Sequence, residues 1–486
     1  MEAWGYRLKR LSAASLNEAA LQTRRPLYDR SKTTIGVVHF GPGAFHRAHQ
    51  AVYFDRLLAA DPRWAICGVS LRSSEVQDAL APQDGLYTLL ELGERTRPRI
   101  IGALTQILVA PREPEAVAAR LAAPTTHLVT LTVTQSGYCL TPEGVLDLAH
   151  PDIIHDLSGA MWPRSVEGWL VEGLRRRRAA RLPAFTVLSC DDLPSNGRRL
   201  REAVIAFAAL RDPELARWIA RETRFPRTLS DSITPATDDA LRLRAGCATG
   251  LMDAWPVQRE PFSQWVIEDD LGPDRDALAV IATLTDEVEA WEQAQRHLLG
   301  GVRTSLAYLG LLRGRRTVRD AVADEPLIGF LRAMLLDEIV PVLQAPRDFN
   351  ASAYVEALFE RFRNPAIEHK LSQLAWDGSD KLPARILPII ADALAADRSI
   401  RRLAYPVAAW MRFVVRQAAA AAPLTDPLAG TLATLGRQCG GDAARDIERF
   451  LTLDCVFPAR LTQDARFREA LAWAYARLPS ELDSGT

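Results

Sequence analysis

The chain of 486 residues carries 59 Lys and Arg against 60 Asp and Glu, which gives a formal net charge of -1. This balance provides no long-range field to attract nucleic acid or an anionic membrane surface, so neither partner is expected. Apolar residues make up 48% and charged residues 24%, which excludes a disordered chain. The length predicts two domains, or three at most, and allows the chain to bury a large core.

Cysteine spacing and the N-terminal stretch indicate which bonds, sites and cellular compartment to expect. The six cysteines show no C-x-x-C spacing, so neither a disulfide framework nor a zinc knuckle is predicted. The beginning of the chain, MEAWGYRLKRL, has no apolar signal-peptide region, and no run of about 18 apolar residues follows. We therefore expect a cytoplasmic protein that does not span a membrane and acts on a small molecule.

The stretch from Thr33 to Asp55 carries the clearest pattern. A short β-rich run leads into Gly41-Pro42-Gly43, after which apolar residues recur at helical spacing. A strand, a glycine turn and a helix allow the backbone to approach a diphosphate, which the amides at the helix start stabilise. His46 replaces the third glycine of G-x-G-x-x-G, so an ordinary β-turn-α connection stays open as an alternative. The predicted cofactor-binding residues are Gly41, Gly43, Ala44, Phe45, His46 and Arg47.

The following segments alternate between strand and helix patterns. Strands are predicted over residues 64–71, 100–110, 127–134 and 185–190, and a helix over 166–180. Such alternation predicts an α/β domain with a parallel sheet over residues 1–285. Helical periodicity then dominates, which predicts a mainly α-helical domain over residues 286–486.

The end of the second strand bears on the choice of cofactor. In a dinucleotide-binding domain an acidic residue usually stands here and binds the adenosine ribose. The sequence is Arg72-Ser73-Ser74-Glu75. Arg72 and the serines could hold a 2′-phosphate, whereas Glu75 could accept the ribose hydroxyls. Both NAD and NADP stay open, and NAD is favoured.

Several longer strings resemble one known family. They are VVHFGPGAFHRAHQAVY, WAICGVSLRS, LAPQDGLYTLLE, LSCDDLPSNG, SLAYLG and NPAIEHKLSQLAWDGSDKLP. Together they are similar to the mannitol dehydrogenase family, which includes the fructuronate (D-mannonate) reductases. The resemblance implies a Rossmann-like domain followed by a helical domain, no metal, and usually a monomer. It also implies that NAD(H) or NADP(H) serves to interconvert an alcohol of a polyol or sugar acid and the matching ketose. The string around Gly378 and Lys381 is more similar to the hexuronate-type members. Lys381, which the family pattern retains, is predicted to bind a substrate hydroxyl or carboxylate, and a solvated surface lysine stays open as the alternative.

The catalytic pattern of this family, K-x-x-x-x-N-x-x-H, has changed in this chain. Its three positions are occupied by Gln295, Gly300 and Arg303. The family string S-C-D-N reads S-C-D-D and ends in Asp192, and V-D-R-I reads S-D-S-I and contains Asp231. A glutamine amide cannot accept a proton, so a general base that is worth about 10²- to 10⁴-fold in rate has no occupant at its family position. An ionised Asp192 would also repel a developing oxyanion.

Two readings of these changes remain open. In the first, the enzyme has a rebuilt site in which Arg303 stabilises the oxyanion, and Asp231, Asp192, Glu292 or His297 serves as base. At about 100° per residue, Glu292, Gln295 and Arg303 would lie within about 80° of one another on one helix. In the second, the fold persists as a nucleotide-binding or regulatory protein without hydride transfer, and Asp192 and Arg303 form an ion pair in the old catalytic pocket. The class of the protein is predicted as oxidoreductase in either case. A third class, a structural or interaction protein that binds no nucleotide, stays open if Gly41 and Gly43 are only turn residues.

Overall fold

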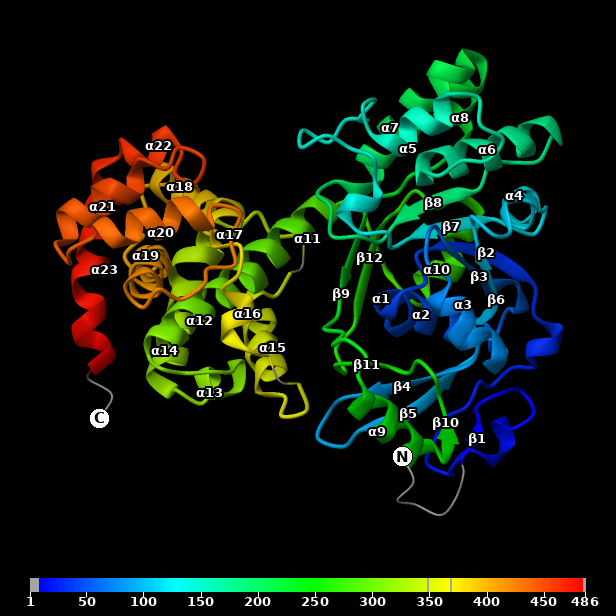
Figure 1. Ribbon diagram of the computed structural model, residues 1–486, viewed down its shortest axis with the longest axis horizontal. Coiled ribbons are helices and arrows are strands. Elements are labelled where there is room, and N and C mark those ends of the chain that lie inside the picture. The colour runs from blue at the N-terminus through cyan, green and yellow to red at the C-terminus, as the bar shows by residue number, and fades with distance from the viewer. Residues whose placement is uncertain (1–7, 348, 368, 484–486) are drawn as a thin grey trace. The chain divides into compact units, whose positions relative to one another are not determined.

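The computed structural model describes residues 8–347, 349–367 and 369–483 (Figure 1). The chain divides into two compact units, Met1–Val288 and Glu289–Thr486. The first unit is built around a parallel sheet and the second is helical, which confirms the predicted fold class. The prediction that the chain has no targeting signal rests partly on residues 1–7, which lie outside the described residues. Within the described part of the chain, no helix is both long and apolar enough to cross a membrane.

The central sheet of the first unit has five strands, all parallel. In spatial order they are β6 (Leu104–Val109), β3 (Ala65–Ser70), β2 (Ile35–Phe40), β7 (Leu128–Leu131) and β8 (Thr186–Ser189). The chain therefore runs from β2 outward through β3 to β6, and then returns to the other side of β2 at β7. Ligands of open parallel sheets bind at the carboxyl ends of the strands where the order reverses in this way.

Helices cover both faces of the sheet (Figure 1). Successive side chains of a strand point to opposite faces, so Val38 and Phe40 enter one buried apolar cluster while Val37 enters another. The helices of this unit up to β9 are α1 (Ala44–Ala48), α2 (Gln50–Leu57), α3 (Glu75–Leu80), α4 (Pro114–Ala122), α5 (Pro151–Leu157), α6 (Val166–Ala179), α7 (Asn196–Arg211) and α8 (Pro213–Glu222).

Smaller sheets complete the first unit. β4 (Tyr87–Glu91) pairs with β5 (Arg97–Ile101) and β11 (Val257–Arg259), and β12 (Gln264–Glu268) pairs with β9 (Thr228–Asp231) and β13 (Thr283–Thr285). The short strands β1 (Lys9–Arg10) and β10 (Leu251–Met252) pair with each other, and α9 (Asp239–Thr249) and α10 (Arg275–Ala279) follow β9 and β12.

The prediction of one strand over residues 100–110 is wrong, because β5 and β6 separate at Gly102. Arg30 donates a hydrogen bond to the Gly102 carbonyl at 3.0 Å, and a Cβ at Gly102 would lie 2.8 Å from Cγ of Pro26. The segment that precedes β2 therefore packs directly onto the backbone between the two strands. Sequence periodicity gave no sign of this break.

The second unit packs its helices around α12 (Gly301–Leu312) and α19 (Ala404–Ala419). Trp410 of α19 and Tyr308 of α12 are buried in its core. The other helices are α11 (Val288–Ala294), α13 (Val318–Val322), α14 (Glu325–Ala333), α15 (Ala351–Arg363), α16 (Leu371–Leu374), α17 (Gly378–Arg385), α18 (Leu387–Ala395), α20 (Ala429–Gln438), α21 (Ala443–Leu451), α22 (Ala459–Thr462) and α23 (Ala465–Asp483).

Between α11 and α12 the backbone forms a π-helix, η7 (Gln295–Gly300). A second π-helix, η8 (Met334–Ile339), follows α14. A π-helix closes its hydrogen bonds over one more residue than an α-helix does, so its turn is wider. The prediction that places Glu292, Gln295 and Arg303 within about 80° assumed regular α-helical geometry, and that geometry does not hold across η7.

Candidate functional site

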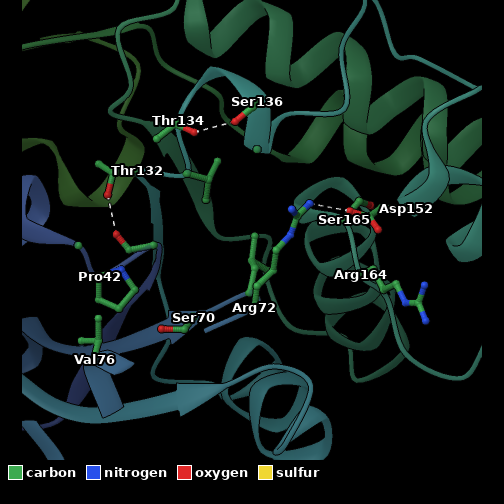
Figure 2. A pocket seen from close by; sticks show the side chains of 15 residues that line it. Pro42, Ser70, Arg72, Val76, Thr132, Thr134, Ser136, Asp152, Arg164 and Ser165 are labelled. Carbon is green, nitrogen blue, oxygen red and sulfur yellow. Dashed lines mark hydrogen bonds and ion pairs between the residues drawn. The ribbon is translucent and has the colours of Figure 1, made fainter. Parts of the chain in front are cut away.

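A cavity of about 370 Å³ opens at the carboxyl ends of β2, β3 and β7 (Figure 2). This is the edge of the sheet at which the strand order reverses. Its volume lies in the range of small-molecule sites. The cavity is lined by Gly41, Pro42, Gly43, Ser70, Leu71, Arg72, Val76, Thr132, Val133, Thr134, Ser136, Gly137, Asp152, Arg164 and Ser165.

The two glycines of the turn have different roles. Gly41 has φ of +85°, and a Cβ there would lie 2.2 Å from the Thr132 carbonyl oxygen. Only glycine therefore permits β2 and β7 to approach each other at this point. A Cβ at Gly43 would come no closer than 3.9 Å to any heavy atom beyond its neighbours, so this side of Gly43 is open. Because Gly43 lines the cavity, its missing side chain leaves room for a ligand against the backbone.

The predicted cofactor residues that follow Gly43 divide into two groups. Ala44 and Phe45 are half-buried at the start of α1, where helix geometry leaves the first amides without intrahelical acceptors. The side chains of His46 and Arg47 are fully buried and are not part of the cavity lining. Whether any of the four contacts a cofactor stays a prediction.

His46 and Arg47 hold α1 against the rest of the unit. The ring of His46 stacks on that of His39 with centroids 3.3 Å apart, and burial is the main cause that lowers the pKa of His46 well below its usual value. Arg47 Nη1 donates to the Trp255 carbonyl at 2.5 Å, and its guanidinium lies over the Tyr87 ring. Burial lowers the pKa of Arg47 to about 10, so the side chain stays charged at neutral pH.

One wall of the cavity is the loop after β7, and Asp191 holds it in place. The carboxylate of Asp191 accepts hydrogen bonds from the amides of Val133 (2.9 Å) and Thr134 (3.0 Å) and from the Tyr138 hydroxyl (2.7 Å). Burial raises the pKa of Asp191. Thr134 has φ of +66° and ψ of 163°, which is an unfavourable conformation for a residue with a side chain. The hydrogen bonds that Asp191 accepts from this loop offset the strain at the edge of the cavity.

The end of β3 places Arg72 in the cavity wall but not Glu75. Arg72 Nη2 lies 3.0 Å from Oδ2 of Asp152, which reaches the cavity from α5 (Figure 2). Glu75 is exposed at the start of α3 and is not part of the lining. The carboxylate that lines the cavity beside Arg72 therefore comes from a helix far along the chain.

The two acidic site residues predicted in the first unit lie at strand ends outside the cavity lining. Asp192 is exposed in the turn after β8, next to Asp191. Asp231 is the last residue of β9, is 6% exposed and pairs with Gln264 of β12. Its negative charge acts on His49, whose pKa is nevertheless lowered to about 3 by burial.

In the second unit, the altered family positions lie on consecutive helical segments. Gln295 begins η7 and is half-buried, Gly300 ends it and is buried, and Arg303 lies in the first turn of α12. A Cβ at Gly300 would lie 3.1 Å from Cδ of Arg385, so the stem of Arg385 occupies the space beside this glycine. An asparagine side chain at position 300 would have to displace it.

Lys381 lies in α17 and belongs to the same surroundings. Its Nζ donates to the carbonyl of Trp376 at 2.5 Å and to that of Leu374 at 3.4 Å. Burial lowers the pKa of Lys381, and the positive charges of Arg385 and Arg303 lower it further. Arg303 also contributes, after burial, to lowering the pKa of His369 to about 4. Lys381 Nζ also lies 4.0 Å from Oδ2 of Asp377, whose negative charge opposes this lowering. The side chains of Lys381, Arg385 and Arg303, together with the neutral imidazole of His369, form the group that we call the basic cluster.

Both candidate bases of the helical unit are buried. Glu292 is 8% exposed in α11, and His297 is 5% exposed in η7. Burial lowers the pKa of His297 to about 4, so this imidazole is neutral at neutral pH. A base with so low a pKa is a weak proton acceptor under these conditions.

Sequence reasoning missed several residues of the cavity wall. Asp152, Arg164 and Ser165 come from the segment around α5 and the start of α6, where no motif marks them. Thr132 and Val133 directly follow β7, so the rule that ligands bind at the carboxyl ends of parallel strands could have found them. Asp191 lies in the string LSCDDLPSNG, in which the sequence pattern predicts a site role only for its neighbour Asp192.

Comparisons with known proteins agree with this architecture. A family model described as "Mannitol dehydrogenase Rossmann domain" matches residues 35–277, and one described as "Mannitol dehydrogenase C-terminal domain" matches residues 287–479. Uncharacterized oxidoreductase YeiQ of Escherichia coli K12 is 38% identical over 461 residues, which cover 93% of this chain and 94% of the relative.

Two further proteins extend these similarities. D-mannonate oxidoreductase of the same strain is 37% identical over 473 residues, which cover 95% of this chain and 96% of the relative. Among solved structures, Pseudomonas fluorescens mannitol 2-dehydrogenase in a ternary complex with NAD and D-mannitol matches with a TM-score of 0.81 and 35% identity. That match covers 98% of this chain and 99% of the other.

Proposed function

Because the chain belongs to the mannitol dehydrogenase family, we propose that it is an NAD-dependent oxidoreductase that interconverts a secondary alcohol of a sugar acid or polyol and the matching ketose. The observation that carries the proposal is the cavity at the carboxyl ends of β2, β3 and β7. Gly43 presents open backbone to it, as the approach of a dinucleotide diphosphate requires. The expected state is a monomer, which light scattering tests.

A sugar acid is the substrate class that the basic cluster favours. Arginine and lysine side chains bind carboxylates through charge-assisted hydrogen bonds. In this chain Arg303 occupies the position at which the family pattern has histidine, and Arg385 lies beside Gly300. The similarity to D-mannonate oxidoreductase supports the same class.

The proton that leaves the substrate hydroxyl needs an acceptor other than Gln295. The bound nicotinamide would take up the hydride, and a side chain of the protein must take up the proton. Asp231, Asp192, Glu292 and His297 are the candidates, and the low pKa of His297 makes it the weakest of them near neutral pH. We expect turnover to be about 10²- to 10⁴-fold slower than in family members that retain the lysine.

A nucleotide-binding protein without turnover is the second candidate. The observation that favours it is the stem of Arg385, which fills the space beside Gly300 where the family pattern requires an asparagine side chain. A cofactor cavity and a catalytic residue depend on different parts of the chain, so one can persist without the other.

Two measurements test the proposal. Titration with NADH and NADPH, followed by fluorescence or calorimetry, should show binding, and binding of neither would remove both candidate functions. Assays with fructuronate, tagaturonate, mannonate and mannitol should then show slow turnover of a sugar acid. A rate typical of the family would contradict the role given to Gln295. Tight NADH binding with no turnover of any substrate would favour the second candidate.

A further inference from the structure

The cavity wall at the carboxyl end of β3, where the adenosine ribose of a dinucleotide is expected, lacks the usual acidic residue. The second strand of a dinucleotide-binding sheet usually ends in an acidic residue that binds the ribose. In this chain β3 ends at Ser70, and residues 70–74 read Ser-Leu-Arg-Ser-Ser without an acid. The next acidic residue, Glu75, is exposed and outside the cavity lining. The strand end therefore supplies a positive charge where a carboxylate is customary.

Asp152 supplies a carboxylate to the same place from α5. Its Oδ2 lies 3.0 Å from Nη2 of Arg72, and both residues line the cavity. The Asp152 side chain is only 20% exposed, whereas that of Arg72 is 76% exposed. Asp152 is thus the more firmly placed member of the pair. The other arginine of the lining, Arg164, extends away from Arg72 (Figure 2).

We propose that Asp152 determines the cofactor preference of the cavity in favour of NAD. Its carboxylate replaces the missing strand-end acid as acceptor for the adenosine ribose hydroxyls. It also occupies the Arg72 guanidinium, which would otherwise be available to a 2′-phosphate. A 2′-phosphate would meet the negative charge of Asp152 and would have to compete with it for Arg72. This inference rests on the proposed function, because it assumes that the cavity binds a dinucleotide.

Arg72 and Asp152 could also favour NADP, and removal of the Asp152 charge would then have the opposite effect on NADPH binding. If Arg72 bound a 2′-phosphate and Asp152 only oriented the guanidinium, loss of the Asp152 charge would weaken NADPH binding. If Asp152 instead selects NAD, loss of its charge frees Arg72 and strengthens NADPH binding. The sign of one measured change therefore distinguishes the two arrangements.

The experiment compares dissociation constants for NADH and NADPH in the full-length protein at one fixed ionic strength. In the unchanged protein we expect NADH to bind more tightly. Asp152→Asn keeps the shape of the side chain and should shift the ratio of the two constants toward NADPH by about 10-fold or more. The double variant Asp152→Asn with Arg72→Gln should lose this shift, because the freed guanidinium is then absent.

Glu75→Gln is the matched control, since it removes one negative charge near the end of β3 from a residue outside the cavity. Its ratio should stay within about 3-fold of the unchanged protein. A shift in Glu75→Gln without one in Asp152→Asn would overturn the proposal, and so would weaker NADPH binding in Asp152→Asn. If the unchanged protein binds neither dinucleotide, the proposed function fails as well. If it binds NADH but Asp152→Asn leaves the ratio unchanged, only the present inference fails.

Discussion

The nucleotide cavity of the first unit and the altered family positions of the second are built from different parts of the chain. The cavity depends on backbone: a glycine with φ of +85°, an open glycine and the carboxyl ends of three strands. The family catalytic positions depend on side-chain chemistry, and three of them carry different residues here. A site made of backbone persists as long as the fold does, whereas a site made of side chains can change residue by residue. Membership in a family therefore predicts the first kind of site better than the second.

The strongest test of the backbone site is Gly41→Ala. The new Cβ would lie 2.2 Å from the Thr132 carbonyl oxygen, at a φ that alanine disfavours. We expect the free energy of unfolding to fall by about 2–5 kcal/mol, as measured by denaturant titration. Gly43→Ala should change it by less than about 0.5 kcal/mol but weaken NADH binding by about 10-fold or more. Unchanged NADH binding in Gly43→Ala would contradict the role given to this turn.

The side-chain site can be tested by rebuilding the family pattern. Gln295→Lys, Gly300→Asn and Arg303→His, combined with Asp192→Asn, should raise kcat on a sugar acid by about 100-fold. Because the stem of Arg385 lies beside position 300, the set should work better when Arg385→Ala is added. Asp192→Asn alone is the control and should change kcat little. If kcat does not rise even with Arg385→Ala, residues other than these four family positions also prevent catalysis.

Acid should destabilise the first unit more than the second. Burial lowers the pKa of His39 and His49 to about 3 and that of His46 well below its usual value. In the second unit it lowers the pKa of His297 and His369 to about 4. Each of these histidines is neutral when folded and binds a proton on unfolding, so stability falls as pH drops from about 6.5 toward these folded values.

At pH 5 each such histidine lowers the free energy of unfolding by about 2 kcal/mol relative to neutral pH. The first unit carries more of them, so its β2 amides should lose hydrogen-exchange protection between pH 7 and pH 5 before those of α12 do. Exchange measured by mass spectrometry at the two pH values checks this order. Earlier loss of protection in α12 would show that carboxylates, and not the buried histidines, control the acid response.

The smallest effect is expected for Lys381→Met. The variant removes two hydrogen bonds to the carbonyls of Leu374 and Trp376 and should lower the unfolding free energy by about 1 kcal/mol. NADH affinity should not change. If Lys381 also binds substrate, KM for the sugar acid should rise as well, and a stability loss without any change in KM would assign Lys381 a purely structural role.

Much of the fold was predictable because periodicity reports burial directly. The strand over residues 185–190 and the helix over 166–180 appear as β8 and α6 with nearly the predicted bounds. The break at Gly102 was not predictable, because it depends on Pro26 and Arg30, which are distant in the sequence. Local patterns cannot show which remote segment packs on a given backbone position.

The candidate site was predictable only where it follows from strand ends. Gly41 and Gly43 are marked by their residue type, and both line the cavity. Asp152 is not marked, since nothing in the local pattern around α5 indicates that its side chain meets Arg72. Likewise, the side chain that fills the space beside Gly300 belongs to Arg385, which is remote in sequence and became visible only in three dimensions.

The π-helix η7 has a consequence for protein engineering. Residues before Gln295 and after Gly300 belong to two α-helical frames that are joined by a wider turn, so a single helical wheel drawn across them assigns faces incorrectly. Grafting a functional motif that spans this turn onto a straight helix would rotate one half of it away from the other. Conversely, a one-residue deletion within η7 offers a route to a straight helix, with the downstream side chains turned toward new neighbours.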